Sequence, residues 1–188
     1  MTSNEDLPQD IPSAPPLATI AQGISDAGEH WAIKVGGTRD DCYTFMDIEL
    51  PDGQQAGGGG MGGQALLPGR FLNCSVHWWD GSGVSVGYVV GRLHPEVRRV
   101  CLEYAGGVPG LDLEPVGESA ELGVSFVGAV LPRSVNLVRI SAWDGQGELL
   151  DQEGTSHYGA TLQAGDRGSA SPNPTAGEDS GWRPLDNT

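Results

Sequence analysis

The middle of the chain contains one strand pattern twice, and this duplication limits the fold more than any other feature of the sequence. Residues 84–107 read VSVGYVVGRLHPEVRRVCLEYAGG, and residues 122–145 read LGVSFVGAVLPRSVNLVRISAWDG. Aligned from their first residues, the two copies have coinciding apolar positions, so that Tyr88 matches Phe126. Each copy is predicted to form a strand, a short connection that contains proline, and a second strand. The copies are either two equivalent hairpins or two pairs of sandwich strands built alike.

Short alternating segments fill the rest of the central region. Apolar residues occupy every second position of most of 42–50 and 71–78, and an Asp-Gly turn follows each segment. The 188 residues include 30 glycines and 13 prolines, and helical periodicity is almost absent. These features are typical of antiparallel strands joined by tight turns. We therefore predict an all-β fold, an immunoglobulin-like antiparallel sandwich of about eight or nine short strands in two sheets with solvated outer faces.

The ends of the chain differ from the middle in composition. Residues 1–29 contain five acidic residues and no basic one, and they include few residues that a core could bury. We predict a disordered acidic segment over 1–29, a β-sandwich domain over 30–152 and a disordered acidic tail over 153–188. The glycine-rich stretch 54–69 is predicted to be a loop without regular structure.

The charge of the chain excludes several classes of partner. The formal net charge is -15, and such a chain should repel nucleic acid and anionic membranes, because both require a basic surface. The N-terminus has no basic and apolar leader, and no stretch is apolar enough to span a membrane. We therefore expect a cytoplasmic protein by default, with an unidentified protein as its partner.

Motifs that match catalytic or metal sites lack the structural context that the chemistry requires. Gly83–Gly87 fits GxSxG, but Ser85 lies in an alternating strand and no helix follows, so a serine hydrolase is only a remote alternative. Gly57–Gly62 fits GxGxxG merely because it is almost all glycine. Cys74 and His77 have the spacing of metal ligands, but on a strand they point to opposite faces. We predict no catalytic residue, no metal and no cofactor.

Four aromatic residues are the candidates for a binding surface. Tyr43 and Phe45 are predicted on the outer face of their strand, where solvent-exposed apolar groups indicate an interaction site. Trp79 and Trp143 each precede an Asp-Gly turn, where an exposed indole could stack on a ligand. We predict a non-enzymatic interaction or regulatory module. The alternative is a sandwich that binds a carbohydrate or small ligand through Trp79 and Trp143.

Residues 31–151 resemble a small β-sandwich module of uncharacterised proteins from high-GC actinobacteria. The resemblance rests on GGGMG, VGYVVGRLHPEVRRVCLEY and SFVGAVLPRSVNLVRISAWDGQGELL, and it implies a fold and no activity. In such modules a cysteine often lies in the glycine-rich segment and could pair with an earlier strand cysteine. Here Met61 occupies that position opposite Cys42, which removes this disulfide. The three cysteines, Cys42, Cys74 and Cys101, are predicted to be small hydrophobic residues of the core.

Overall fold

The protein is described by a computed structural model that covers residues 16–81 and 83–155, and nearly all of its regular structure is β. The elements in chain order are β1 (Ala18–Ile24), β2 (His30–Gly37), β3 (Cys42–Glu49), β4 (Gln55–Met61), β5 (Leu72–Gly81), β6 (Val84–Leu93), β7 (Arg99–Tyr104), the short 3-10 helix η1 (Ala105–Gly107), β8 (Leu111–Leu113), β9 (Gly117–Ser119), β10 (Val124–Val130), β11 (Leu137–Trp143) and β12 (Leu149–Gly154). The prediction of an all-β chain is confirmed. Within the described residues no helix has the length and apolar character needed to cross a membrane.

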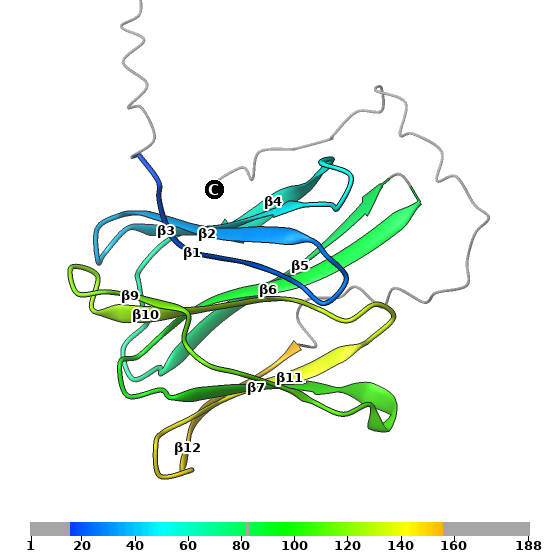
Figure 1. The fold of residues 1–188 in the computed structure, drawn as a ribbon. Helices are drawn as coiled ribbons and strands as arrows, with labels where there is room; N and C mark the ends of the chain where they lie inside the picture. Colours follow the sequence, from blue (N-terminus) through cyan, green and yellow to red (C-terminus); the bar gives the residue numbers. More distant parts are fainter. Residues whose placement is uncertain (1–15, 82, 156–188) are drawn as a thin grey trace, which may run out of the picture.

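The strands form three antiparallel sheets, whereas the sequence predicted two. Sheet A has the order β1-β2-β3-β4, sheet B the order β5-β6-β10-β9, and sheet C the order β12-β11-β7-β8. Sheet B is the middle layer, with sheet A above it and sheet C below it in the view of Figure 1. One apolar core fills the space between sheets A and B, and a second fills the space between sheets B and C.

The middle layer explains why the two-sheet prediction was wrong. Every residue of β6 from Val86 to Leu93 is buried, because one side of the strand faces the A–B core and the other faces the B–C core. Tyr88 and Val90 belong to the first core, and Val89 and Leu93 belong to the second. A strand buried on both faces has a nearly continuous apolar sequence, and VSVGYVVGRL is such a sequence.

The duplicated segments form two strand pairs that each cross from sheet B to sheet C. The first copy is β6 and β7, and the second is β10 and β11; β6 pairs with β10, and β7 pairs with β11. Val90 lies opposite Gly128, which is its own equivalent in the second copy, and Leu102 likewise lies opposite Ile140. Antiparallel strands with equivalent residues opposite one another are related by a local pseudo-twofold axis. The copies are therefore pairs of sandwich strands, and the hairpin alternative is wrong.

The ordered domain begins earlier than predicted. Residues 18–24 lie within the segment expected to be disordered, yet they form β1, which pairs along its length with residues 30–35 of β2. Ile20 and Ala21 pack against the A–B core, and this apolar burial stabilises the strand. The sequence contains little sign of it, because the residues around the strand are polar. At the other end, β12 extends to Gly154. The remaining parts of the predicted disordered segments, 1–15 and 156–188, lie outside the described residues.

The glycine-rich stretch was predicted to be a loop, but much of it forms β4, an edge strand of sheet A. The glycines allow aromatic rings to approach the backbone from both sides. A Cβ atom on Gly58 would lie 2.4 Å from the ring of Phe45. A Cβ atom on Gly59 would lie 2.6 Å from His77 Nδ1 and 2.7 Å from the hydroxyl of Tyr88. Close packing of rings against backbone therefore replaces the usual side-chain contacts of a strand.

Candidate functional site

An open groove of about 510 Å³ lies on the outer face of sheet A. Its lining is mostly polar and comes from all four strands of the sheet. The lining residues are Gln22, Gly23, Ile24, His30, Trp31, Ala32, Lys34, Asp47, Glu49 and Gln55. The groove thus combines two carboxylates, one ammonium group, two amides and an imidazole, whereas the indole of Trp31 packs against the A–B core.

The register of the strands explains why this face is hollow. Residues opposite one another in antiparallel strands form rows that run across the sheet. The middle row is Gln22, Ala32, Asp47 and Gly58, and the rows beside it are Thr19, Lys34, Phe45 and Gly60, and Ile24, His30, Glu49 and Gln55. Ala32 has only a methyl group, so the middle row is low where it crosses β2, whereas the ring of Phe45 covers Gly58 at the β4 end of the row. The groove therefore crosses the strands instead of following them.

The polar groups of the groove already have partners. Lys34 forms an ion pair with Asp47, and these side chains are 38% and 32% exposed. Glu49 Oε2 accepts a hydrogen bond of 3.1 Å from Gln55 Nε2. An ion pair this accessible to water contributes at most about 1 kcal/mol to stability. A bound ligand can therefore rearrange these contacts at little cost.

Two of the four predicted binding residues lie beside this groove. Tyr43 and Phe45 are on the outer face of β3, as predicted from the alternation of the strand. Tyr43 is 43% exposed. Phe45 is half-buried, because its ring covers the backbone of Gly58. The structure therefore brings Tyr43 and Phe45 together on one surface.

The structure does not bring the two tryptophans together. Trp79 pairs with Val86 at the beginning of β6, and its ring packs against Gly57 and the A–B core. The carbonyl of Trp143 accepts a hydrogen bond from the N–H of Arg98, which follows the other end of β6. Figure 1 shows the β5–β6 and β11–β12 hairpins at opposite ends of the molecule. A single ligand site that uses both rings does not exist in this arrangement.

Trp143 lies on the outer face of sheet C beside charged residues. The guanidinium carbon of Arg99 is 5.2 Å from the centre of the indole ring, a distance typical of a cation–π contact. The indole Nε1 is buried and has no hydrogen-bond partner among the described residues. Arg99 also lies 3.7 Å from a carboxylate oxygen of Asp112. These contacts cover the ring and leave it half-buried.

Ser85 of the GxSxG match has no histidine near it in the described part of the chain. It is exposed near the beginning of β6 and lies opposite Asp80. His94 follows the other end of the same strand, and His157 lies outside the described residues. The arrangement around Ser85 therefore lacks the serine–histidine pair of a nucleophile elbow.

A different serine forms a hydrogen bond with a histidine, and the sequence analysis missed it. Ser75 Oγ lies 2.7 Å from His77 Nε2. Burial lowers the pKa of His77, and its ring stacks on Tyr88 at 5.2 Å. The sequence SVH contains the signal, because residues two apart on a strand share a face. A nucleophile triad also needs a group that orients the histidine, and no carboxylate of the described residues bonds to His77.

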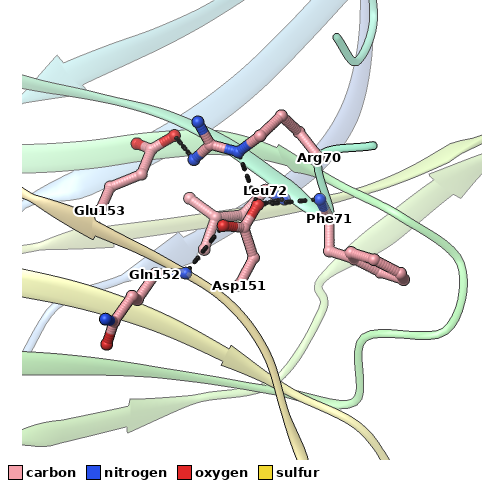
Figure 2. A network of polar contacts seen from close by, with 6 residues as sticks. All are labelled: Arg70, Phe71, Leu72, Asp151, Gln152 and Glu153. Carbon is pink, nitrogen blue, oxygen red and sulfur yellow. Dashed lines mark hydrogen bonds and ion pairs between the residues drawn. The ribbon is translucent and has the colours of Figure 1, made fainter. Parts of the chain in front are cut away.

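A second polar network joins sheet C to the beginning of sheet B, as Figure 2 shows. Arg70 precedes β5 and donates to Asp151 at 2.8 Å and to Glu153 at 2.6 Å. The same oxygen of Asp151 accepts the backbone N–H groups of Phe71 at 2.9 Å and Leu72 at 3.3 Å. Because β12 supplies both carboxylates, the network attaches an edge strand of sheet C to β5 across the rim of the B–C core.

The pKa values of the two carboxylates of this network are shifted in opposite directions. Burial disfavours ionisation of Asp151, but the hydrogen bonds from Arg70, Phe71 and Leu72 outweigh it and lower its pKa. For Glu153, burial is the larger effect and raises its pKa, in spite of the charge of Arg70. Both shifts indicate a structural ion-pair network, because its groups bond to one another and the chain's own backbone.

Arg92 is the most deeply buried charged residue of the described chain, and its side chain is fully inaccessible to solvent. Its guanidinium donates only to neutral oxygens. The acceptors are the hydroxyl of Thr44 and the carbonyls of Cys42, Met61, Gly63 and Gln64, at 2.7–3.2 Å. Burial lowers its pKa. Arg92 therefore joins β6 of the middle sheet to β3, to the end of β4 and to the segment that follows it.

The described residues contain no group of three or more His, Cys, Asp or Glu side chains that could hold a metal ion. Cys42, Cys74 and Cys101 form no disulfide with one another. The first two are buried, as predicted, and Cys101 is half-buried. Burial raises the pKa of Cys74, which makes this thiol a poor nucleophile.

Comparison of the chain with protein-family models, with curated proteins and with solved structures finds no match. The resemblance to an actinobacterial module therefore stays a prediction from the sequence. Any functional conclusion must come from the geometry of the site itself.

Proposed function

We propose that the chain is a non-catalytic binding module and that its ligand site is the groove on the outer face of sheet A. The main support is the hollow over the short side chain of Ala32, with polar groups on both sides of it. Clefts with a few convergent polar groups are the usual sites for small ligands. The ligand we propose is therefore a small polar molecule.

The layered architecture also favours this face. Both faces of sheet B are covered, so a ligand can reach a sheet face only on sheet A or sheet C. On sheet C, paired charged side chains and Trp143 occupy the outer face, among them Arg139 with Glu103. The outer face of sheet A also has an ion pair, Lys34 with Asp47, but unlike sheet C it has a groove beside the pair. The groove lining contains no serine, threonine or cysteine, so it offers no hydroxyl or thiol nucleophile.

Amide chemical-shift mapping by NMR tests the proposal. The uniformly ¹⁵N-labelled chain is titrated with three classes of probe: neutral oligosaccharides, nucleotides and short cationic peptides. At least one class should perturb amides around Gln22, Ala32 and Asp47 and leave those of β11 unchanged. The proposal is wrong when no class perturbs these amides, or when a saccharide that binds is cleaved into shorter products.

For the fold, we propose that the immunoglobulin-like description applies to β5–β12. The support is that these strands form two four-stranded antiparallel sheets around one core. An experimental structure of the chain, compared over these strands alone with two-sheet sandwiches, tests this. The cytoplasmic location and the protein partner are retained as proposals from the sequence.

A further inference from the structure

We infer that the groove on the outer face of sheet A binds a neutral, hydroxyl-rich ligand, namely a saccharide. This inference rests on the proposed function, because it names the ligand class of the same groove. It concerns a face on which the sequence analysis had considered only Tyr43 and Phe45. The tryptophans that the sequence analysis had assigned to carbohydrate binding lie elsewhere.

The charges of the groove disfavour ionic ligands. Asp47 and Glu49 are its two carboxylates and Lys34 its one ammonium group, so an anion would meet a net negative surface in a chain of net charge -15. A cation would be attracted by the carboxylates but repelled by Lys34, which already forms an ion pair with Asp47. A cation would therefore have to displace Lys34 or Gln55 from a carboxylate, whereas a ligand without net charge can bind while both pairs stay in place.

Hydroxyl groups match the hydrogen-bonding groups of the lining. A hydroxyl donates one hydrogen bond and accepts others, so neighbouring hydroxyls can donate to Asp47 and accept from Lys34 together. The amides of Gln22 and Gln55 likewise offer both a donor and an acceptor. A ligand with several adjacent hydroxyls can thus pair with the acids, the base and the amides without leaving a charged group unpaired.

The shape of the groove fits a short chain of sugar rings. The middle row of the groove runs over Gln22, Ala32 and Asp47 of β1, β2 and β3; neighbouring strands lie about 4.8 Å apart, so this row is about 10 Å long. Ala32 keeps the row low where it crosses β2.

The test is isothermal titration calorimetry with neutral hexasaccharides of glucose, xylose, mannose and N-acetylglucosamine, using the full chain. At least one of them should bind. Ala32→Trp should fill the middle row and weaken this binding by about tenfold or more, while Val138→Trp on sheet C serves as the matched control and should leave it unchanged. Gln22→Trp, at the exposed end of the same row, gives a second blocked variant that does not depend on the folding of the first. If both blocked variants bound the hexasaccharide as tightly as the original chain does, the inference would be overturned.

A second variant separates recognition of hydroxyls from recognition of charge. Lys34→Gln together with Asp47→Asn removes both charges and keeps the hydrogen-bonding groups. Saccharide affinity should stay within about fivefold of the original value, and it should change by less than about twofold between low and physiological ionic strength. A groove that binds cations or anions would instead lose its ligand in this variant.

The two proposals fail in different ways. If only nucleotides or cationic peptides perturb the groove in the NMR titration, the saccharide assignment is wrong and the binding module stands. If none of the probe classes perturbs the groove, both are wrong. A third outcome also contradicts the inference. If Val138→Trp abolished hexasaccharide binding and Ala32→Trp left it unchanged, the saccharide would bind on sheet C.

Discussion

Two arginines join neighbouring layers of this molecule, one inside the A–B interface and one at the rim of the B–C interface. Arg92 is fully buried and donates to Thr44 and to four backbone carbonyls. Arg70 is partly exposed and forms ion pairs with Asp151 and Glu153. Arg92 thus relies on neutral oxygens at fixed positions, and Arg70 relies on opposite charges beside solvent.

The difference shows which physical quantity each interface depends on. A buried cation with neutral acceptors is held by geometry, so its contribution should be insensitive to salt and to mild acid. A partly exposed ion-pair network depends on the ionisation of its carboxylates, so it should respond to both. The A–B interface should therefore fail when its shape changes, and the B–C rim should fail when its charge changes.

The largest effect is expected from Arg92→Met. This change keeps the apolar stem but removes every donor of the guanidinium, so four carbonyls and a hydroxyl each lose one hydrogen bond. The free energy of unfolding should fall by about 3–5 kcal/mol, because a buried acceptor left without a donor costs about 1–3 kcal/mol and the relief from burying a guanidinium offsets part of the sum. Urea denaturation measures it. Arg92→Lys retains a charge with fewer donors, so its free energy of unfolding should lie between those of the original chain and Arg92→Met. A loss below about 1 kcal/mol for Arg92→Met would show that the geometry of the acceptors matters little.

A smaller effect in the same interface is expected from Gly59→Ala. The new methyl group would overlap with His77 Nδ1 and the hydroxyl of Tyr88, so one ring must move. The loss of stability should be about 1–3 kcal/mol, as for other overpacked sites. Gly145→Ala is the control, because the nearest atom to its Cβ, on Arg98, is at 3.7 Å. Equal losses in the two variants, measured by urea denaturation, would contradict the packing argument.

The all-β class, the duplication and the inward faces of single strands could be predicted from the sequence. The alternation in β3 and β5 identified Cys42, Met46, Leu72 and Cys74 as core residues, because each strand has only one fully buried face. The third sheet was missed because β6 was treated as an alternating strand, although its apolar residues are almost continuous. That run was the available evidence for a strand buried on both sides.

The candidate site was less predictable than the fold class. The groove depends on which residues face one another across β1, β2, β3 and β4, and this register is a non-local property. β4 itself was hidden, since its glycines have low strand propensity and its stability comes from the rings of Phe45 and His77. The tryptophans were chosen from their local turn motif, which contains no information on where two turns lie relative to each other.

At the B–C rim, Asp151→Asn should have an effect that depends on pH. The pKa of Asp151 is lowered in the folded state, so its ionised form stabilises the fold above the unfolded pKa of about 4, and this contribution is lost as the pH falls through the folded value. At neutral pH the variant should lose about 1–2 kcal/mol, because Phe71 and Leu72 then donate to a neutral group. Urea denaturation between acid and neutral pH should show a flatter acid limb for the variant. The same loss at every pH would contradict the role of the charge.

The smallest effect is expected from Glu153→Gln in the same network. Burial raises the pKa of Glu153, so the folded state binds its proton more tightly than the unfolded state does, and its ionised form opposes folding as the pH rises through the raised value. Glutamine removes the buried charge and keeps an oxygen for Arg70, so the two effects should nearly cancel at neutral pH, to within about 0.5 kcal/mol. Asp151→Asn measured beside it by urea denaturation is the matched comparison. If Glu153→Gln destabilised the chain as much as Asp151→Asn, the rim would depend on total negative charge instead of on the N–H groups of Phe71 and Leu72 that Asp151 accepts.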